Sequence, residues 1–228
     1  SIQPKDTAAI LRRLSKKAEL DLPLLSFQGV GRACSLRLEK TENIFRKKYA
    51  RTVGYMGALS EETNQRFLFN WCSKMENTKE YEAVMNTAAD FANRMNGKES
   101  CKFFYDKKLD DFMYQDGQRI LPVGHQSAGF QSLIWMVFDI ACRMAMLNPH
   151  KQEEIAKTKG IVLIDELDMH LDSQWQGKVI DALRGVFPNV QFIAATHSQE
   201  LIASAKDVRI IDIEHEEPEY SYLKEAQE

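Results

Sequence analysis

The stretch from Gly160 to Asp172 constrains the fold more than any other part of the chain. Four apolar residues, 161–164, run directly into two adjacent acids, Asp165 and Glu166. An uninterrupted apolar run of this length predicts a strand buried on both faces of a parallel sheet. The two acids would then lie at the carboxyl edge of the sheet, where open α/β folds bind their ligands. The alternative is a buried strand followed by two solvated acids.

Two neighbouring carboxylates at a strand end suit nucleotide hydrolysis. One carboxylate can hold Mg²⁺ through its coordinated water, and the next can polarise the attacking water. This arrangement is typical of a Walker B strand followed by a catalytic glutamate. We therefore expect Asp165 to be the metal ligand and Glu166 to be the catalytic base.

A second predicted strand ends in a histidine. The segment from Val190 to His197 is mostly apolar and ends in Thr196 and His197. Because parallel strands end at the same edge of a sheet, we expect His197 near the two acids, where its ring can donate to a phosphate or to the attacking water. A lone histidine is more often a packed or surface residue, and that alternative stays open here.

A long apolar helix is predicted from Ser127 to about Asn148, and Pro149 ends it. The Ser127 hydroxyl can cap the helix by accepting from its first free backbone amides. Gly129 has no side chain, so backbone amides can approach a phosphate closely there. The amino end of a helix carries partial positive charge and therefore suits an anion. A plain helix cap is the alternative explanation for the serine.

Taken together, these segments resemble the ABC-type ATPase domain shared by transporters, SMC-like proteins and DNA-repair ATPases. Their order is that of the family: signature motif, Walker B strand, D-loop and switch histidine. The matching residues are Ser127, Ala128 and Gly129 in the signature motif, Asp172 in the D-loop and His197 as the switch histidine. Gln126 replaces the leucine that usually precedes the signature serine. The resemblance extends from about Leu121 to Ala205.

The resemblance implies an α/β fold, in which a P-loop NTPase-like sheet is flanked by helices and interrupted by a helical insertion. It implies ATP and Mg²⁺ as cofactors. It also implies a dimer at least, because the signature and D-loop residues of one subunit would complete the ATP site of the other. The implied division is a remainder of the amino-terminal ATPase lobe (1–60), a helical insertion (61–100) and a carboxy-terminal ATPase lobe (101–228).

Longer segments are similar to one branch of these ATPases, the OLD-like proteins. This branch includes the PtuA subunit of Septu anti-phage systems and the ATPases of related retrons. The segments that carry this similarity are 22–32, 121–123, 126–141, 165–171 and 187–198. The similarity implies an HNH nuclease partner resembling PtuB, controlled by the ATP state, and in retrons a reverse transcriptase with its RNA–DNA hybrid. An SMC- or RecF-like DNA-repair ATPase and a non-hydrolysing nucleotide sensor remain as alternatives.

The sequence has no phosphate-binding loop of the form Gly-x-x-x-x-Gly-Lys-Ser/Thr. The segment from Gln28 to Cys34 is glycine-bearing, but it is too short and has no lysine. We expect an amino-terminal lobe carrying Walker A to be missing from this chain, and ATP hydrolysis to require it. A degenerate relative without hydrolysis is the alternative.

Composition narrows the classes of protein to which the chain can belong. The 228 residues carry a net charge of −3, with 44% apolar and 28% charged residues, as ordinary globular proteins do. No apolar run approaches the roughly 20 residues of a membrane span, and we expect no membrane partner. Four widely spaced cysteines without a Cys-x-x-Cys pair predict reduced thiols in a cytoplasmic protein. The basic first fifty residues could face nucleic acid, although a solvated helix surface is the commoner cause.

Overall fold

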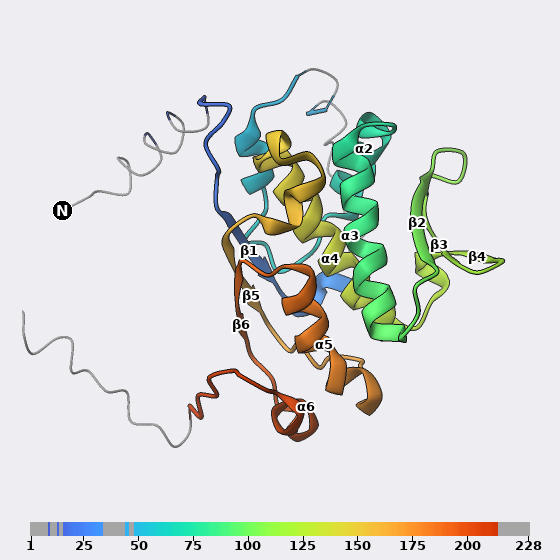
Figure 1. The fold of residues 1–228 in the computed structure, drawn as a ribbon, viewed down its shortest axis with the longest axis vertical. Helices are drawn as coiled ribbons and strands as arrows, with labels where there is room; N and C mark the ends of the chain where they lie inside the picture. Colours follow the sequence, from blue (N-terminus) through green and yellow to red (C-terminus); the bar gives the residue numbers. More distant parts are fainter. Residues whose placement is uncertain (1–8, 10–12, 14–15, 34–43, 46–47, 214–228) are drawn as a thin grey trace, which may run out of the picture.

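The computed structural model describes residues 9, 13, 16–33, 44–45 and 48–213. Two separate three-stranded sheets and a set of helices make up these residues, so the predicted α/β class is confirmed (Figure 1). The parallel sheet has the order β1-β5-β6 and contains β1 (Leu24–Gln28), β5 (Gly160–Ile164) and β6 (Val190–Ala194). The antiparallel sheet consists of β2 (Cys101–Asp106), β3 (Asp111–Asp116) and β4 (Arg119–Pro122).

Within the described residues, five α-helices and four 3₁₀ helices connect and cover the strands. The α-helices are α2 (Gln65–Met75), α3 (Lys79–Asn96), α4 (Ala128–Leu147), α5 (Ser173–Val186) and α6 (Gln199–Ser204). The 3₁₀ helices are η1 (Val30–Ala33), η2 (Arg51–Tyr55), η3 (Val123–His125) and η4 (Pro149–Lys157). The Asp116-Gly117 pair predicts a tight hairpin turn, and the structure confirms the hairpin, because β3 and β4 are joined through Gly117 at φ 61°.

Helix α4 forms the centre of the core. By length and composition it could cross a membrane, but 94% of the relevant window is buried inside the described structure, as in the core helix of a globular domain. Two charged residues lie among its apolar side chains. Arg143 and Asp139 are each 3% exposed and are bonded to each other at 2.7 Å. The pair is satisfied further by the carbonyl oxygens of Gly54 and Met56, to which Arg143 donates.

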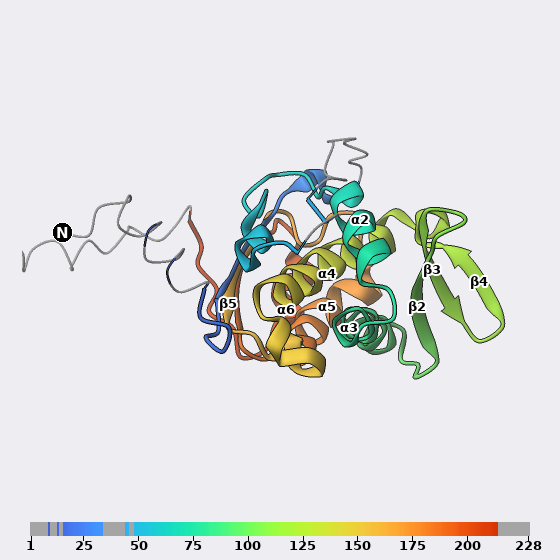
Figure 2. The same cartoon turned by 90° about the horizontal axis from the view of Figure 1, so that it is seen from above.

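The parallel sheet is covered on one face by helices, as Figures 1 and 2 show for α4 and α5. On its other face Leu25, Ile161, Leu163 and Ile193 are 38–52% exposed. The prediction that β5 is buried on both faces is therefore wrong for the described residues. An apolar run has the same composition whether one face or two are covered, so the sequence could not separate these cases.

Helices α2 and α3 occupy the region assigned to an insertion. Their buried residues, including Trp71 and Phe91, belong to the same hydrophobic cluster as α4. These helices therefore pack into the common core, and the division into 1–60, 61–100 and 101–228 stays a prediction. The apolar pattern of residues 208–213 predicts a strand, but the structure shows none there, so this prediction is wrong. The pattern of residues 220–222 also predicts a strand, and this segment lies outside the described residues.

Candidate active site

The loops that follow β5 and β6 are joined at the carboxyl edge of the parallel sheet. The Asp165 amide donates to the carbonyl of Gln28 at the end of β1, at 2.9 Å. The Leu167 amide donates to the carbonyl of Ala195, just past β6, at 3.1 Å. The chain therefore brings the acidic loop and the histidine loop together, as the strand order requires.

The two acids are presented differently. Asp165 is half-buried, whereas Glu166 is exposed. Glu166 also has a left-handed backbone, with φ 45°. A residue with a Cβ in this region costs on the order of 1–3 kcal/mol, and such strain clusters at functional sites. Surrounding hydrogen bonds have to hold this conformation.

A buried arginine supplies two of those hydrogen bonds. Arg32 in η1 donates from Nη1 to the Asp165 carbonyl and from Nη2 to the Glu166 carbonyl, both at 2.6 Å. Arg32 was not singled out from the sequence. The only local signal was a cation within a glycine-bearing turn, and its partners lie 133 and 134 residues further along the chain.

The loop after β6 presents His197, which is exposed. On either side of it, Thr196 and Ser198 tie the loop down. The Thr196 hydroxyl donates to the Asp168 carboxylate, and the Ser198 amide donates to the Thr196 hydroxyl at 3.0 Å. The backbone around His197 is thus fixed to the acidic loop while its ring faces solvent, which suits contact with a ligand.

At the amino end of α4, the predicted cap is confirmed. The Ser127 hydroxyl accepts from the Phe130 amide at 3.3 Å, and both Ser127 and Ala128 are exposed. Gly129 is buried, and a Cβ there would lie 2.4 Å from the His170 carbonyl oxygen. The glycine therefore permits close packing against the acidic loop of the same chain. Its expected approach to a phosphate stays a prediction.

Asp172, the D-loop candidate, also caps α5. Its carboxylate accepts from the Trp175 amide at 2.9 Å. The sequence pattern predicts Ser173 as this cap, so that prediction is wrong by one residue. Aspartate is a strong cap because its charge also complements the helix dipole. A contact of Asp172 with a nucleotide remains a prediction.

The oxygen donors at this edge fit Mg²⁺ only as part of a coordination shell. Within the described ranges, no group of three or more His, Cys, Asp or Glu side chains is placed to hold a metal ion. Mg²⁺ usually takes one or two carboxylates and completes its octahedron with substrate phosphates and water. Asp165, with Glu166 beside it, matches that donor set.

A parallel sheet whose carboxyl edge gathers two acids, a histidine and a helix amino terminus is an arrangement typical of ligand-binding α/β domains. The chain matches the family described as the AAA ATPase domain over residues 5–202. It therefore belongs to the AAA ATPase domain family, and the recognition of an ATPase domain is confirmed.

Three curated relatives are informative. The Retron Vc95 probable ATPase of Vibrio cholerae serotype O1 biovar El Tor is 24% identical, over 93% of this chain and 52% of the relative. The Retron Ec83 probable ATPase of Escherichia coli is 30% identical, over 82% and 31% respectively. The Septu protein PtuA of Bacillus mycoides (strain KBAB4) is 31% identical, over 67% and 21%. The chain thus spans about half, or less, of the length of these relatives.

Among solved structures, the chain is similar to SMC head domains. An SMC head bound to the C-terminal winged-helix domain of ScpA aligns with a TM-score of 0.42 at 17% identity, covering 68% of this chain and 48% of that one. The SMC head domain from Thermotoga maritima aligns with a TM-score of 0.40 at 17% identity, over 55% and 41%.

Proposed function

We propose that this chain carries the catalytic loops of an ATPase. Asp165 would hold Mg²⁺, Glu166 would accept the proton of the attacking water, and His197 would donate to the γ-phosphate or to that water. The observation that carries the proposal is the strained, firmly held Glu166 at the end of β5, in a chain of the AAA ATPase domain family. Mg²⁺ would supply charge neutralisation on the phosphates.

The phosphate-binding loop would come from outside the 228 residues. We infer that a lobe bearing this loop covers the exposed apolar face of the parallel sheet. Support comes from Leu25, Ile161, Leu163 and Ile193, which are 38–52% exposed on that face. An apolar sheet face of this kind is stabilised when a further layer covers it. The phosphates would then reach the acids at the carboxyl edge of the sheet.

The working unit would be at least a dimer with composite sites. Ser127, Ala128, Gly129 and Asp172 would serve the nucleotide of a second copy. The exposed amino end of α4 supports this role, because its first amides and its dipole suit an anion. Asp172 lies in the same acidic loop that packs on Gly129 through His170, so the two candidate elements lie against each other.

The biological setting would be bacterial anti-phage defence in the cytoplasm. The names of the retron and Septu relatives favour this setting over DNA repair. The ATP state would then control an associated PtuB-like HNH nuclease, and in a retron a reverse transcriptase with its RNA–DNA hybrid would join the complex. Co-purification of a nuclease with the complete protein tests the partner.

The catalytic assignment is tested by Glu166→Gln in the complete protein that carries this chain. The amide keeps the shape of the side chain and loses its basicity, so kcat should fall by about 10²–10⁴-fold while ATP still binds. Phosphate release and binding of a fluorescent ATP analogue measure the two effects. Glu153→Gln, an exposed acid of η4, is the matched control and should keep the parent kcat. Hydrolysis by Glu166→Gln at the parent rate would refute the assignment.

A further inference from the structure

We propose that Arg32 is a positioning residue that sets the direction of the Glu166 side chain and links it to helix α4. The inference rests on the function proposed above, and it deepens that function by naming what holds the catalytic base. Arg32 is 0% exposed. Its guanidinium therefore cannot reach solvent or a ligand, and any influence on the reaction passes through the groups that it touches.

The guanidinium holds the backbone on both sides of Glu166. The Asp165 carbonyl belongs to the peptide plane before Glu166, and the Glu166 carbonyl belongs to the plane after it. Nη1 and Nη2 donate to these two oxygens, each at 2.6 Å. With both planes fixed, φ and ψ of Glu166 are fixed, and so is the direction of its Cα–Cβ bond. A left-handed residue needs such support, because its Cβ then lies too close to the following carbonyl oxygen.

Arginine is suited to this task and lysine is not. The planar guanidinium presents donors in a rigid fork, so two carbonyls can be held at once in a defined geometry. Two further donations complete its contacts, from Nη1 to the Gly29 carbonyl at 3.0 Å and from Nε to the Ser132 hydroxyl at 2.9 Å. An ammonium group at the same place would reach fewer acceptors and would fix none of the planes.

The contact with Ser132 extends the arrangement to α4. Ser132 is 0% exposed and lies near the amino end of this helix, beyond the Ser127 cap. A displacement of that end therefore reaches the Glu166 backbone through a single side chain. A ligand that binds at Ser127 would therefore be connected to the catalytic base through helix α4, Ser132 and Arg32.

The charge of Arg32 adds to the hydrogen bonds. Burial lowers the pKa of its guanidinium, while attraction to Asp165, Glu166 and Asp168 opposes that change. A buried cation next to three acids would be costly to place without a purpose in packing or function. Its hydrogen bonds to the Asp165 and Glu166 carbonyls fix the acidic loop, which is the contribution that we propose.

The test compares Arg32→Lys, Glu166→Gln and the double variant in the complete protein. Arg32→Lys should lower kcat by about 10–100-fold and leave the KM for ATP within about threefold, because only the transition-state geometry is lost. In the Glu166→Gln background the same substitution should change the residual rate by less than about twofold, because Arg32 acts through Glu166. A merely structural defect would lower both backgrounds equally.

Arg51→Lys is the matched control, since Arg51 also donates to backbone carbonyls but lies at the other end of α4. It should lower the melting temperature and keep kcat within about twofold of the parent. If Arg32→Lys does not fold, Ser132→Ala replaces it, with an expected fall in kcat of about two- to fivefold that disappears in the Glu166→Gln background.

The outcomes separate the two proposals. If Glu166→Gln hydrolyses ATP at the parent rate, Glu166 is not the catalytic base, and the role proposed for Arg32 fails as well. Two results would overturn the role of Arg32 while Glu166→Gln is inactive. One is a kcat for Arg32→Lys equal to that of the parent. The other is an effect of Arg32→Lys that is as large in the double variant as in the parent. An unchanged kcat for Ser132→Ala would overturn it in the same way where Arg32→Lys is insoluble.

Discussion

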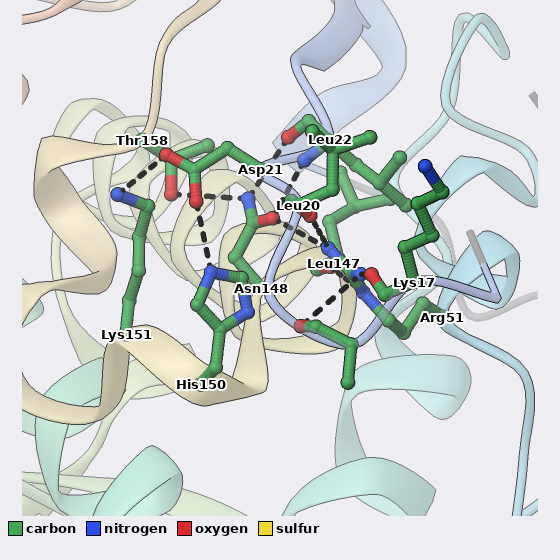
Figure 3. Close-up of polar contacts among 11 residues, drawn as sticks. Lys17, Leu20, Asp21, Leu22, Arg51, Leu147, Asn148, His150, Lys151 and Thr158 are labelled. Atoms are coloured by element: carbon green, nitrogen blue, oxygen red, sulfur yellow. Dashed lines mark hydrogen bonds and ion pairs between the residues drawn. The ribbon is translucent and has the colours of Figure 1, made fainter. Parts of the chain in front are cut away.

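Helix α4 is held by an arginine at each end, and the two ends differ in what the arginine holds. At the carboxyl end, Arg51 donates to the Leu147 carbonyl, to the Lys17 carbonyl at 2.8 Å and to the Asn148 side chain at 2.9 Å (Figure 3). At the amino end, Arg32 holds the two carbonyls that flank Glu166. Arg51 is partly exposed, whereas Arg32 is fully buried.

The difference separates a structural end from a functional one. The last carbonyls of a helix lack intrahelical partners, and a cation there also complements the dipole, so Arg51 has a structural role at this end. It also ties the segment that precedes β1 to the helix end through the Lys17 and Leu20 carbonyls. At the amino end, the helix itself does not require Arg32 to bind the carbonyls of the acidic loop that follows β5. Substitutions at the carboxyl end should therefore change stability alone, and those at the amino end should change activity as well.

The largest effect at the structural end is expected for Asn148→Ala. Asn148 is 0% exposed, accepts from the Leu22 amide at 2.7 Å and donates to the Leu22 carbonyl at 2.9 Å. Its loss leaves two buried backbone groups unpaired, so the free energy of unfolding should fall by about 2–4 kcal/mol. Urea denaturation measures this loss. A change in kcat at a temperature where the variant is folded would break the comparison.

The next largest effects are expected for glycine-to-alanine substitutions at the two ends of α4, and they should differ between the ends. A Cβ at Gly129 would lie 2.4 Å from a backbone oxygen, that of His170, whereas a Cβ at Gly54 would lie 2.7 Å from the Leu147 side chain. A side chain can move aside more easily than a loop backbone. Gly129→Ala should cost about 1–3 kcal/mol and lower kcat, and Gly54→Ala should cost less and leave kcat unchanged. Equal kcat values for the two variants would contradict the functional assignment of the amino end.

The smallest effect is expected for Asp21→Asn. Asp21 is paired with Lys151 and His150, each at 2.8 Å (Figure 3). The hydrogen bond from Lys151 and then the one from His150 hold its pKa below the usual value, against the opposing effect of burial. A lowered folded pKa gives stability that is present above about pH 4 and is lost as the pH falls through the folded value.

Because this cluster is exposed, the contribution should be under about 1 kcal/mol. Thermal melting of the parent and Asp21→Asn at pH 7 and pH 3 measures it, and the difference between the proteins should shrink at the lower pH. A difference that grows on acidification would show that the sign is wrong.

The sequence predicts the parts of this molecule that depend on local pattern. Strand β5, helix α4, its Ser127 cap and the hairpin at Gly117 all follow from short-range periodicity and turn chemistry. The placement of the acidic loop beside the loop after β6 follows from the parallel order of the strands. These features could be assigned because each depends on neighbours in the chain or on a general rule of sheet topology.

Long-range partners could not be predicted in the same way. Arg32 donates to the Asp165 and Glu166 carbonyls, which lie 133 and 134 residues further along the chain. No local sequence pattern around Arg32 predicts these partners. Likewise, the apolar pattern of residues 208–213 predicts a strand, but a strand also needs an edge with which to pair, and no strand forms there. The exposed face of β5 was missed because composition does not report how many layers cover a sheet.

The most direct test of a functional amino end of α4 is a mixing experiment in the complete protein. Ser127→Arg would block one face of a composite site and Glu166→Gln would disable the other, so each variant should be inactive alone. In a mixed dimer, one site carries both defects and the other carries neither. Phosphate release should therefore reappear on mixing and rise with the fraction of mixed dimers. Mixed dimers that are verified and yet release no more phosphate than the separate variants would contradict a site shared between copies.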